Sequence, residues 1–258
     1  MLRHVLHMNI GIYQGAASLA ACERWQAVIS QNIASSTVPG FKKVEATFES
    51  VLADKTRLGS ESGAGKDING VMPAMVNRLS TQQGELRTTN NEFDFAIQGP
   101  GFFQIQRPNG QPGFTRNGEF HVNSERVLVT REGYPVLGDG GPITLKSGGG
   151  RLSVNSEGSL VQGDTQIGKI GLFSFRDPSA LKHIGDGLLA PGNDSAQPQP
   201  VENGSLLGGA LEGSNVSPLR EMVNLISVGR AYEASQKVII AHDQAVDKAI
   251  QTLGNPNA

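Results

Sequence analysis

The two ends of the chain share an apolar spacing that the middle lacks, and this contrast limits the possible folds more than any other feature. From Val5 to Ile33, and again from Met222 to Leu253, stripe residues recur at alternating steps of three and four. This spacing places side chains on one face of an α-helix. Gly15 weakens the first stripe. We therefore expect a long helix at each terminus.

The second helix has clear end signals. Ser217 can cap it with Pro218 at the first helical position, and Gly254 follows the last stripe residue. At ~1.5 Å per residue, helices of about 30 and 36 residues are rods of roughly 45 and 54 Å. Rods of this length need partners along their whole length. We expect the two helices to pair in a coiled-coil-like manner and to bury further surface against other copies. The alternative is that both pack on the chain's own central domain.

Between the helices the apolar period changes to two. Residues 93–98 and 103–106 alternate apolar and mostly polar side chains, as half-buried strands do. Turn signals such as Asn117-Gly118 and Glu132-Gly133 follow at short intervals, which is typical of a central antiparallel all-β domain. The expected fold class is therefore α+β. The expected domains are residues 1–35 plus 216–258 (helical), 36–70 (extended linker or loop) and 71–215 (β domain).

Charge and composition exclude several classes of protein. The 258 residues carry a net charge of -2, so the basic surface of a nucleic-acid-binding protein is not expected. No apolar run approaches the ~18 residues that span a bilayer. Cys22 is the single cysteine, so no internal disulfide can form. One alternative remains here, because residues 19–22 (Leu-Ala-Ala-Cys) are similar to a lipoprotein cleavage site.

The sequence offers no catalytic or metal-binding constellation. Residues 63–67 fail as a phosphate loop because Asp67 stands where a hydroxyl should bind magnesium. The five histidines are scattered, and Cys22 lies on the apolar stripe, where an inert buried thiol is expected. Glu92 and Asp94 are expected to form part of a solvated strand face. We therefore expect neither an enzyme nor a cofactor.

Several segments, in order along nearly the whole chain, make the sequence resemble the bacterial flagellar rod and hook proteins. Residues 31–42 (QNIASSTVPGFK) resemble the signature that closes the family's first helix. Residues 211–216 (LEGSNV) and 230–233 (RAYE) are similar to segments before and within its last helix. Residues 98–103 (QGPGFF) with 114–118 (FTRNG) resemble the start of its β domain. The proximal-rod subtype is favoured slightly over the distal-rod subtype.

The resemblance implies a structural subunit of the basal-body rod, in the periplasmic space. It implies export in an unfolded state through the flagellar type III apparatus, without a cleaved signal peptide. It also implies polymerisation through the terminal helices into a tube around the export channel. The implied partners are other copies of the chain, neighbouring rod and hook proteins, and the export apparatus. The alternatives are a distal-rod or hook-type subunit, or a non-enzymatic β-domain binding module.

Two groups of residues are candidates for function. The predicted subunit-interface residues are the stripe positions Val5, Met8, Ile12, Leu19, Ile29, Ile33, Met222, Leu225, Tyr232, Ile239, Val246, Ile250 and Leu253. The predicted motif and turn residues are Asn32, Gly40, Phe41, Ser214, Asn215, Arg230 and Tyr232. Among the latter, Asn32, Gly40 and Phe41 are expected to set the turn out of the first helix, because glycine after Pro39 can adopt a positive φ.

Overall fold

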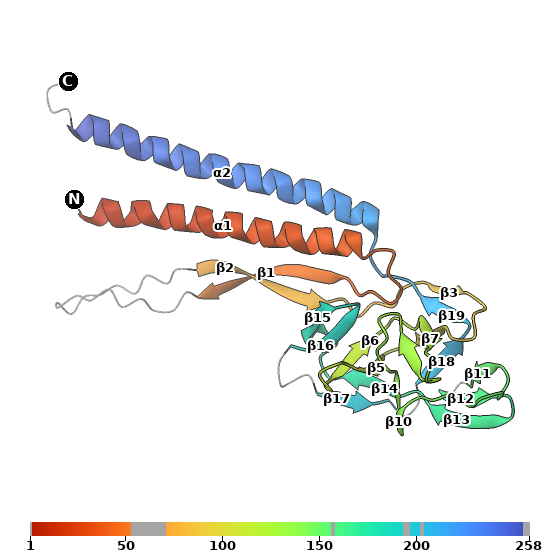
Figure 1. Ribbon diagram of the computed structural model, residues 1–258. Helices are drawn as coiled ribbons and strands as arrows, with labels where there is room; N and C mark the ends of the chain where they lie inside the picture. Colours follow the sequence, from red (N-terminus) through yellow and green to blue (C-terminus); the bar gives the residue numbers. More distant parts are fainter. Residues whose placement is uncertain (1, 53–70, 156–157, 193–196, 202–203, 255–258) are drawn as a thin grey trace, which may run out of the picture. The chain divides into compact units, whose positions relative to one another are not determined.

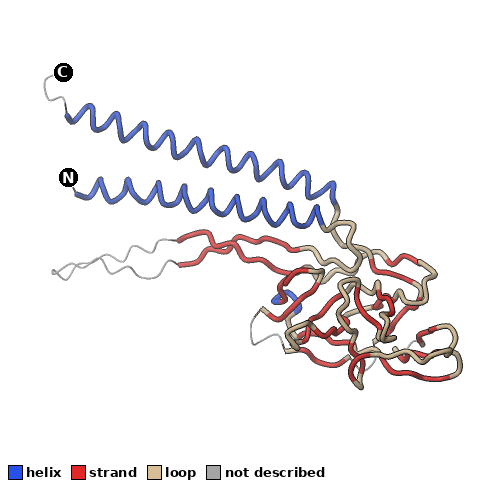
Figure 2. The backbone as a smooth tube through the Cα atoms, in the orientation of Figure 1, coloured by secondary structure: helices blue, strands red, loops and turns tan. Residues whose placement is uncertain are grey.

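The computed structural model describes residues 2–52, 71–155, 158–192, 197–201 and 204–254. The chain divides into two compact units. The helical unit comprises Met1–Gln31, Ala46–Asn77 and Pro218–Ala258, and the β unit comprises Asn32–Glu45 and Arg78–Ser217. The two long helices lie in the first unit and most of the strands in the second (Figure 2). The predicted domain boundaries stay a prediction, because compactness alone does not show that a segment folds independently.

The helical unit contains two helices and most of a two-stranded sheet. Helix α1 spans Leu2–Ala34 and the longer α2 spans Pro218–Gly254. Strands β1 (Val44–Leu52) and β2 (Val71–Leu79) pair with each other, and the Thr47 hydroxyl donates to the Val76 carbonyl at 3.2 Å. In Figure 1 this sheet runs along α1 on the side away from α2. No helix in the described ranges combines the length and apolar character that a bilayer span requires.

The two helices approach closely at one small residue of α1. A Cβ added to Gly15 would lie 2.6 Å from Cγ1 of Ile239, so any larger residue at this position would displace that side chain. About one turn further along, the hydroxyls of Ser18 and Ser235 are hydrogen-bonded at 3.0 Å. Gly15 therefore does not merely weaken the stripe, because it is the position at which Ile239 of α2 packs against the backbone of α1.

The buried face of α2 is displaced from the predicted stripe at every second position. Its buried and half-buried residues include Glu221, Leu225, Val228, Tyr232, Ser235, Ile239, His242 and Val246. The alternate predicted positions are exposed, with Met222 at 49% and Ile250 at 62%. The displacement arises because the true facing positions include small and polar side chains such as Ser235 and His242. The alternating spacing of three and four selects their neighbours Gln236 and Asp243 instead, and both are exposed.

The predicted fold class is therefore wrong in its helical part. The helices do not form a coiled-coil-like domain of two long paired rods, because the unit also contains most of strands β1 and β2, and Met222 and Ile250 of the predicted α2 seam are exposed. The chain is an α+β protein with a central portion that is mostly β. Strand β1 lay outside the prediction because residues 36–70 read as a linker, whereas β2 begins the predicted β domain but belongs mostly to the helical unit.

The β unit is built from short strands around one larger sheet. In spatial order, its six-stranded sheet is formed by β15 (Leu181–Gly185), β16 (Leu188–Pro191), β6 (Pro112–Thr115), β5 (Phe102–Gln106), β14 (Leu172–Phe175) and β17 (Pro198–Pro200). A three-stranded sheet contains β11 (Leu152–Val154), β12 (Ser159–Gln162) and β13 (Thr165–Lys169). A short 3₁₀-helix, η1 (Pro178–Ala180), precedes β15.

Four strand pairs complete the unit, and all of them are antiparallel. They are β4 (Phe95–Gln98) with β18 (Ser205–Gly208), β3 (Leu86–Thr88) with β19 (Ala210–Glu212), β7 (Phe120–Val122) with β8 (Leu128–Thr130), and β9 (Leu137–Gly138) with β10 (Gly141–Pro142). Two of these pairs join the first strands of the unit to its last. The sequence separation of these pairs is therefore large.

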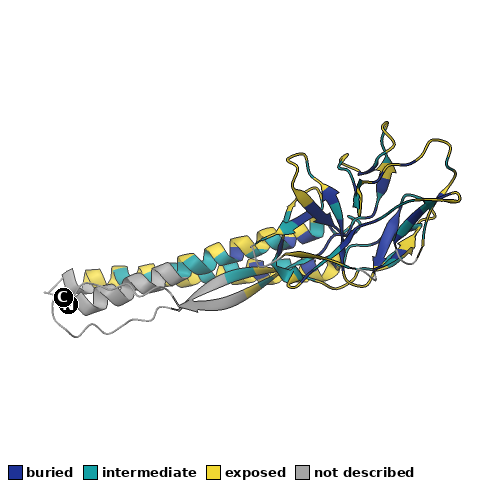
Figure 3. Cartoon of the chain, turned by 90° about the horizontal axis from the view of Figure 1, so that it is seen from below, coloured by how far each residue is buried: buried dark blue, intermediate teal, exposed yellow. Residues whose placement is uncertain are grey.

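Two apolar clusters form the core of the β unit. The larger includes Phe95, Ile97, Phe103 and Leu206, and the smaller is an aromatic group centred on Phe114. Figure 3 shows the buried residues gathered in this unit, whereas exposed residues recur along α2. Strand β4 is not half-buried as expected, because three of its four residues are buried.

Candidate functional site

Several of the segments that carry the sequence motifs meet at one place in the β unit. There, residues 40–44 lie against residues 212–215 and are joined by residues from three other segments. We call this group the motif clamp, and it comprises Asn32, residues 40–44, Gln82, Gly84, Arg116, Glu212 and Asn215. All of its members belong to the β unit.

The centre of the motif clamp is a buried cluster of three charges. Lys42 Nζ lies 2.6 Å from Glu212 Oε1, and Arg116 Nη1 lies 2.9 Å from Glu212 Oε2. The side chains of Lys42, Arg116 and Glu212 are 2%, 4% and 1% exposed. One carboxylate therefore holds two cations away from water, and the cluster carries one net positive charge.

Backbone groups add further hydrogen bonds to these three side chains, although the buried Arg116 Nε has no hydrogen-bond partner among the described residues. Lys42 Nζ also donates to the Gln82 carbonyl at 2.7 Å, and the Gly84 N–H donates to Glu212 Oε1 at 2.9 Å. Arg116 donates to the carbonyls of Ile97 at 3.3 Å and Gly99 at 2.5 Å. Burial lowers the pKa of both Lys42 and Arg116, whereas the carboxylate of Glu212 opposes that shift. These partners make the buried charges tolerable.

Asparagine side chains fasten the same segments through the backbone. Asn32 donates to the Val44 carbonyl at 2.9 Å and accepts from the Val44 N–H at 3.0 Å. Asn215 accepts from the Lys43 N–H at 2.7 Å and donates to the Gln82 carbonyl at 2.9 Å. Each amide thus satisfies both a donor and an acceptor of the main chain.

Gly40 brings two backbone segments into direct contact. Its φ is 68°, and its N–H donates to the Glu212 carbonyl at 2.7 Å. A Cβ at this position would lie 2.2 Å from both the carbonyl carbon of Arg116 and the nitrogen of Asn117. The position therefore requires glycine for two independent reasons.

A histidine from the six-stranded sheet packs on the motif clamp. The ring of His183 stacks on that of Phe41, with centroids 4.7 Å apart and planes 14° apart. His183 Nε2 is 2.9 Å from the Lys42 carbonyl, and it must donate because a carbonyl oxygen accepts. Burial lowers the pKa of His183 below its usual 6.5, more strongly than the hydrogen bond to Lys42 raises it.

The lowered pKa predicts that the β unit loses stability as the solution becomes acidic. With its pKa depressed in the folded state, His183 binds a proton more readily in the unfolded chain. Its stabilising contribution is therefore complete above pH 6.5 and is lost as the pH falls below that value, by at most about 1.4 kcal/mol per pH unit. Urea unfolding of the wild type and of His183→Gln between pH 8 and pH 5 measures this loss. The free energy of unfolding should fall less steeply with pH in the variant, and an equal fall in both proteins would contradict the prediction. The exposed His121→Gln is the matched control.

The predicted motif residues lie in two regions. Asn32, Gly40, Phe41 and Asn215 lie in or beside the motif clamp, and the Ser214 hydroxyl nearby accepts from the Val216 N–H at 3.2 Å. Arg230 and Tyr232 lie on α2, where Arg230 is exposed. The functional roles assigned to these residues, including the turn out of the first helix, stay a prediction.

The predicted interface residues are also distributed over different environments. On α1, Ile29 is buried, and Leu19 and Ile33 are half-buried. On α2, Leu225, Tyr232, Ile239 and Val246 are half-buried. Met222 and Ile250 are exposed. The side chains of Val5, Met8, Ile12 and Leu253 lie outside the described residues. The interface role of all thirteen stays a prediction.

The charged members of the motif clamp were absent from the predicted site. Lys42, Arg116 and Glu212 stand within the quoted motifs, but charged residues are usually exposed, so nothing in the local pattern singled them out. A usable signal existed nonetheless. Each residue lies within two positions of a glycine and of a large apolar residue, and the two signs of charge occur in motifs far apart in the sequence.

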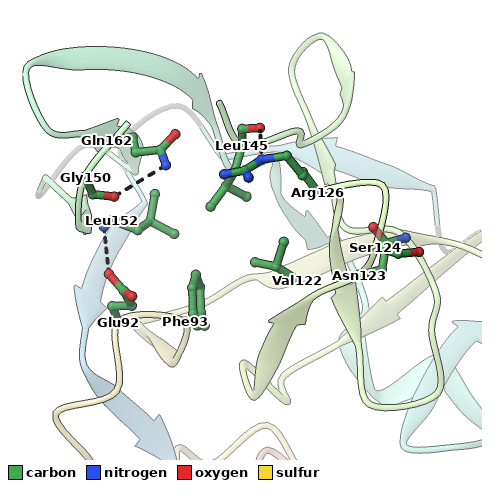
Figure 4. Close-up of a pocket in the computed structure, with 10 residues that line it drawn as sticks. All are labelled: Glu92, Phe93, Val122, Asn123, Ser124, Arg126, Leu145, Gly150, Leu152 and Gln162. Atoms are coloured by element: carbon green, nitrogen blue, oxygen red, sulfur yellow. Dashed lines mark hydrogen bonds between the residues drawn. The ribbon is translucent and has the colours of Figure 1, made fainter. Parts of the chain in front are cut away.

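An open pocket of about 400 Å³ lies elsewhere on the β unit (Figure 4). Phe93, Val122 and Leu152 are among its apolar lining residues. Its polar groups serve the backbone, because Glu92 accepts from the Leu152 N–H at 2.9 Å and Gln162 donates to the Gly150 carbonyl at 3.4 Å. These groups therefore stabilise the loops of the pocket.

The carboxylates near this pocket do not form an acid–base pair. Asp94 is 4% exposed and accepts from the Thr89 hydroxyl at 2.6 Å and the Asn91 amide at 2.9 Å. The expected solvated face is therefore wrong for Asp94, which is held inside the unit by its neighbours. Among the described residues, no group of three or more His, Cys, Asp or Glu side chains is placed to hold a metal ion.

Comparisons with known proteins agree with the motifs that form the clamp. Residues 96–162 match the family model of the flagellar hook protein FlgE/F/G D1 domain, and residues 207–252 match that of the flagellar basal body rod FlgEFG protein C-terminal region. The first match extends from β4 to the end of β12, and the second extends from β18 through most of α2.

Curated relatives match nearly the whole chain. It is 35% identical over 252 residues to the flagellar basal-body rod protein FlgF of Rhizobium meliloti, covering 96% of this chain and 99% of that protein. It is 34% identical over 245 residues to the rod protein FlgG of Buchnera aphidicola subsp. Schizaphis graminum, covering 87% and 92%. It is 30% identical over 260 residues to FlgG of Bacillus subtilis, covering 93% and 97%.

The fold and the matches define a structural protein of the flagellar axis. The chain belongs to the flagellar basal-body rod protein family. It is therefore a structural component of the basal body, and the prediction that it is not an enzyme agrees with this family. Because its relatives include both FlgF and FlgG proteins, the proximal-rod subtype stays a prediction.

Proposed function

We propose that this chain is exported unfolded through the flagellar type III apparatus and then polymerises through its terminal helices into the rod, a tube around the export channel. Its partners are other copies of the chain and neighbouring rod and hook proteins. The observation that carries this proposal is a second apolar face on α2.

The second face occupies the first turns of α2. Leu219, Met222, Val223 and Ile226 are 74%, 49%, 57% and 59% exposed. At 100° per residue these four side chains lie within about 100° of one another. Their mean direction lies about 140° from that of Leu225, Val228 and Tyr232, which belong to the buried face. A helix that is apolar on two separate faces needs a second surface to cover it, and neighbouring subunits in a polymer supply one.

The assembly role of this face predicts a loss of motility without a loss of folding. In the triple variant Leu219→Gln, Met222→Gln and Ile226→Gln, apolar contacts with neighbours are removed from side chains already in water. We expect urea unfolding of the purified chain to change by less than about 0.5 kcal/mol per substitution. Swimming should fall to the level of a strain that lacks the chain, and the variant should be missing from isolated basal bodies.

The matched control carries the same type of substitution on exposed residues of the β unit. Ile184→Gln and Leu207→Gln change side chains that are 42% and 39% exposed. This double variant should swim normally. Normal swimming of the triple variant, with wild-type amounts of chain in the basal body, would refute the assembly role of the second face.

A further inference from the structure

We infer that the β unit folds as one cooperative unit completed by its last strands, β18 and β19. On this inference, residues 78–189 acquire stable structure only when residues 205–215 join them. Three features of the unit support it: the pairing of its strands, the charges of the motif clamp, and the main-chain bonds between its first and last segments.

The strand pairing makes the early strands depend on the late ones. Strand β4 pairs with β18 along its full length, from Phe95 opposite Gly208 to Gln98 opposite Ser205. Phe95, Ala96 and Ile97 are completely buried, and Leu206 of β18 lies in the same core cluster as Phe95 and Ile97. Without β18, buried peptide groups of β4 would lose their hydrogen-bond partners, and the core would lose the apolar contacts of Leu206.

The charges of the motif clamp impose the same order. Lys42 and Arg116 come early in the chain, and in the described structure both form their ion pairs with Glu212. Burying either cation before its counter-ion arrives is strongly unfavourable. This desolvation cost applies to Lys42 and Arg116 together, because both pair with the carboxylate of Glu212. The early segments therefore remain hydrated until Glu212 is in place.

Main-chain bonds join the two ends of the unit directly. The Gly40 N–H donates to the Glu212 carbonyl at 2.7 Å, the Asn215 N–H to the Phe41 carbonyl at 3.3 Å, and the Gly213 N–H to the Glu85 carbonyl at 2.8 Å. These bonds close loops of well over a hundred residues, and long loops carry the largest entropic cost of closure. They form late in folding and complete the unit when they do.

This order of folding has a consequence for export. A growing chain lacks the closing segment until more than four fifths of it has been synthesised, so it stays without a folded β unit during that time. This consequence rests on the proposed function, whereas the folding inference itself does not.

Hydrogen exchange on the purified full-length chain tests the inference. In Glu212→Gln, two buried cations face a neutral amide, and we expect amide protection in β18 and β19 to fall at least 100-fold. Protection in β5 and β6 should fall by the same factor, because all four strands open together. Wild-type protection in β5 and β6 beside lost protection in β18 and β19 would overturn the inference. Glu85→Gln is the matched control, since Glu85 forms an exposed pair with Arg87 at 3.0 Å, and it should leave all four strands unchanged.

A second, milder variant covers the case in which Glu212→Gln does not fold. Asn215→Ala removes the bonds to Lys43 and Gln82 but leaves the three charges intact. We expect about a 10-fold fall in protection, again equal in β5, β6, β18 and β19. Unequal falls would overturn the inference in this variant too. Both measurements use the free chain, so failure of the assembly proposal would not affect them.

Discussion

Replacing Gly40 by alanine is expected to destabilise the β unit by about 2–5 kcal/mol. A left-handed backbone costs a residue with a Cβ about 1–2 kcal/mol. Overpacking adds about 1–3 kcal/mol. Here the added methyl would meet the backbone of Arg116 and Asn117, 2.2 Å away, which cannot rotate aside as a side chain can. Urea unfolding of the full-length chain, followed by circular dichroism, measures the loss.

Gly110→Ala separates the two causes. Gly110 has a similar φ of 77°, but no atom lies within 4 Å of the position that its Cβ would take. This control should therefore cost only the backbone strain, about 1–2 kcal/mol. Equal losses in the two variants would show that the contact of Gly40 with residues 116 and 117 does not limit stability.

The second large effect concerns the charges of the motif clamp. Glu212→Gln leaves Lys42 and Arg116 buried without a counter-ion and is expected to cost about 3–5 kcal/mol. Lys42→Met removes one cation and leaves the pair between Arg116 and Glu212, which is neutral overall. It should cost less, about 1–3 kcal/mol, because Glu212 Oε1 and the Gln82 carbonyl each lose one of two donors, while Gly84 and Asn215 still donate to them. Equilibrium urea unfolding of the two variants gives the order.

The order of these losses is more informative than their size. A larger loss for Lys42→Met than for Glu212→Gln would mean that the hydrogen bonds of the Lys42 ammonium to Gln82 and Glu212, and not the charge balance, determine the stability of the clamp. The exposed pair of Glu85 and Arg87 provides the reference, because Glu85→Gln should change stability by less than about 1 kcal/mol.

The ends of α2 and the β character of the middle follow from local sequence. Pro218 begins α2 and Gly254 ends it, as the capping residues predict. Proline fixes a helical φ and glycine permits the exit from a helix, and both effects act within a few residues. The short strands between frequent turns follow from the same kind of local preference. These features need no knowledge of the rest of the fold.

The stripe on α2 shows where local reasoning stops being sufficient. Leu225, Tyr232, Ile239 and Val246 lie on the half-buried face as the spacing predicts, but Met222 and Ile250 are exposed. Helical periodicity determines which residues share a face, but the packing partner determines which of two adjacent residues is covered. On α2 the covered residue is Ser235 and not Gln236, and Ser235 bonds to Ser18 of α1. The spacing of apolar residues cannot reveal such a contact.

The sequence alone therefore determined the two terminal helices, the β character of the middle, the ends of α2 and, through its motifs, the family of the chain. Only the tertiary structure placed Lys42, Arg116 and Glu212 in one buried cluster and gave β1 and β2 to the helical unit. The physical reason is that helix and turn preferences act over a few residues, whereas burying a charge depends on partners about a hundred or more residues away. Those partners become neighbours only when the chain has folded.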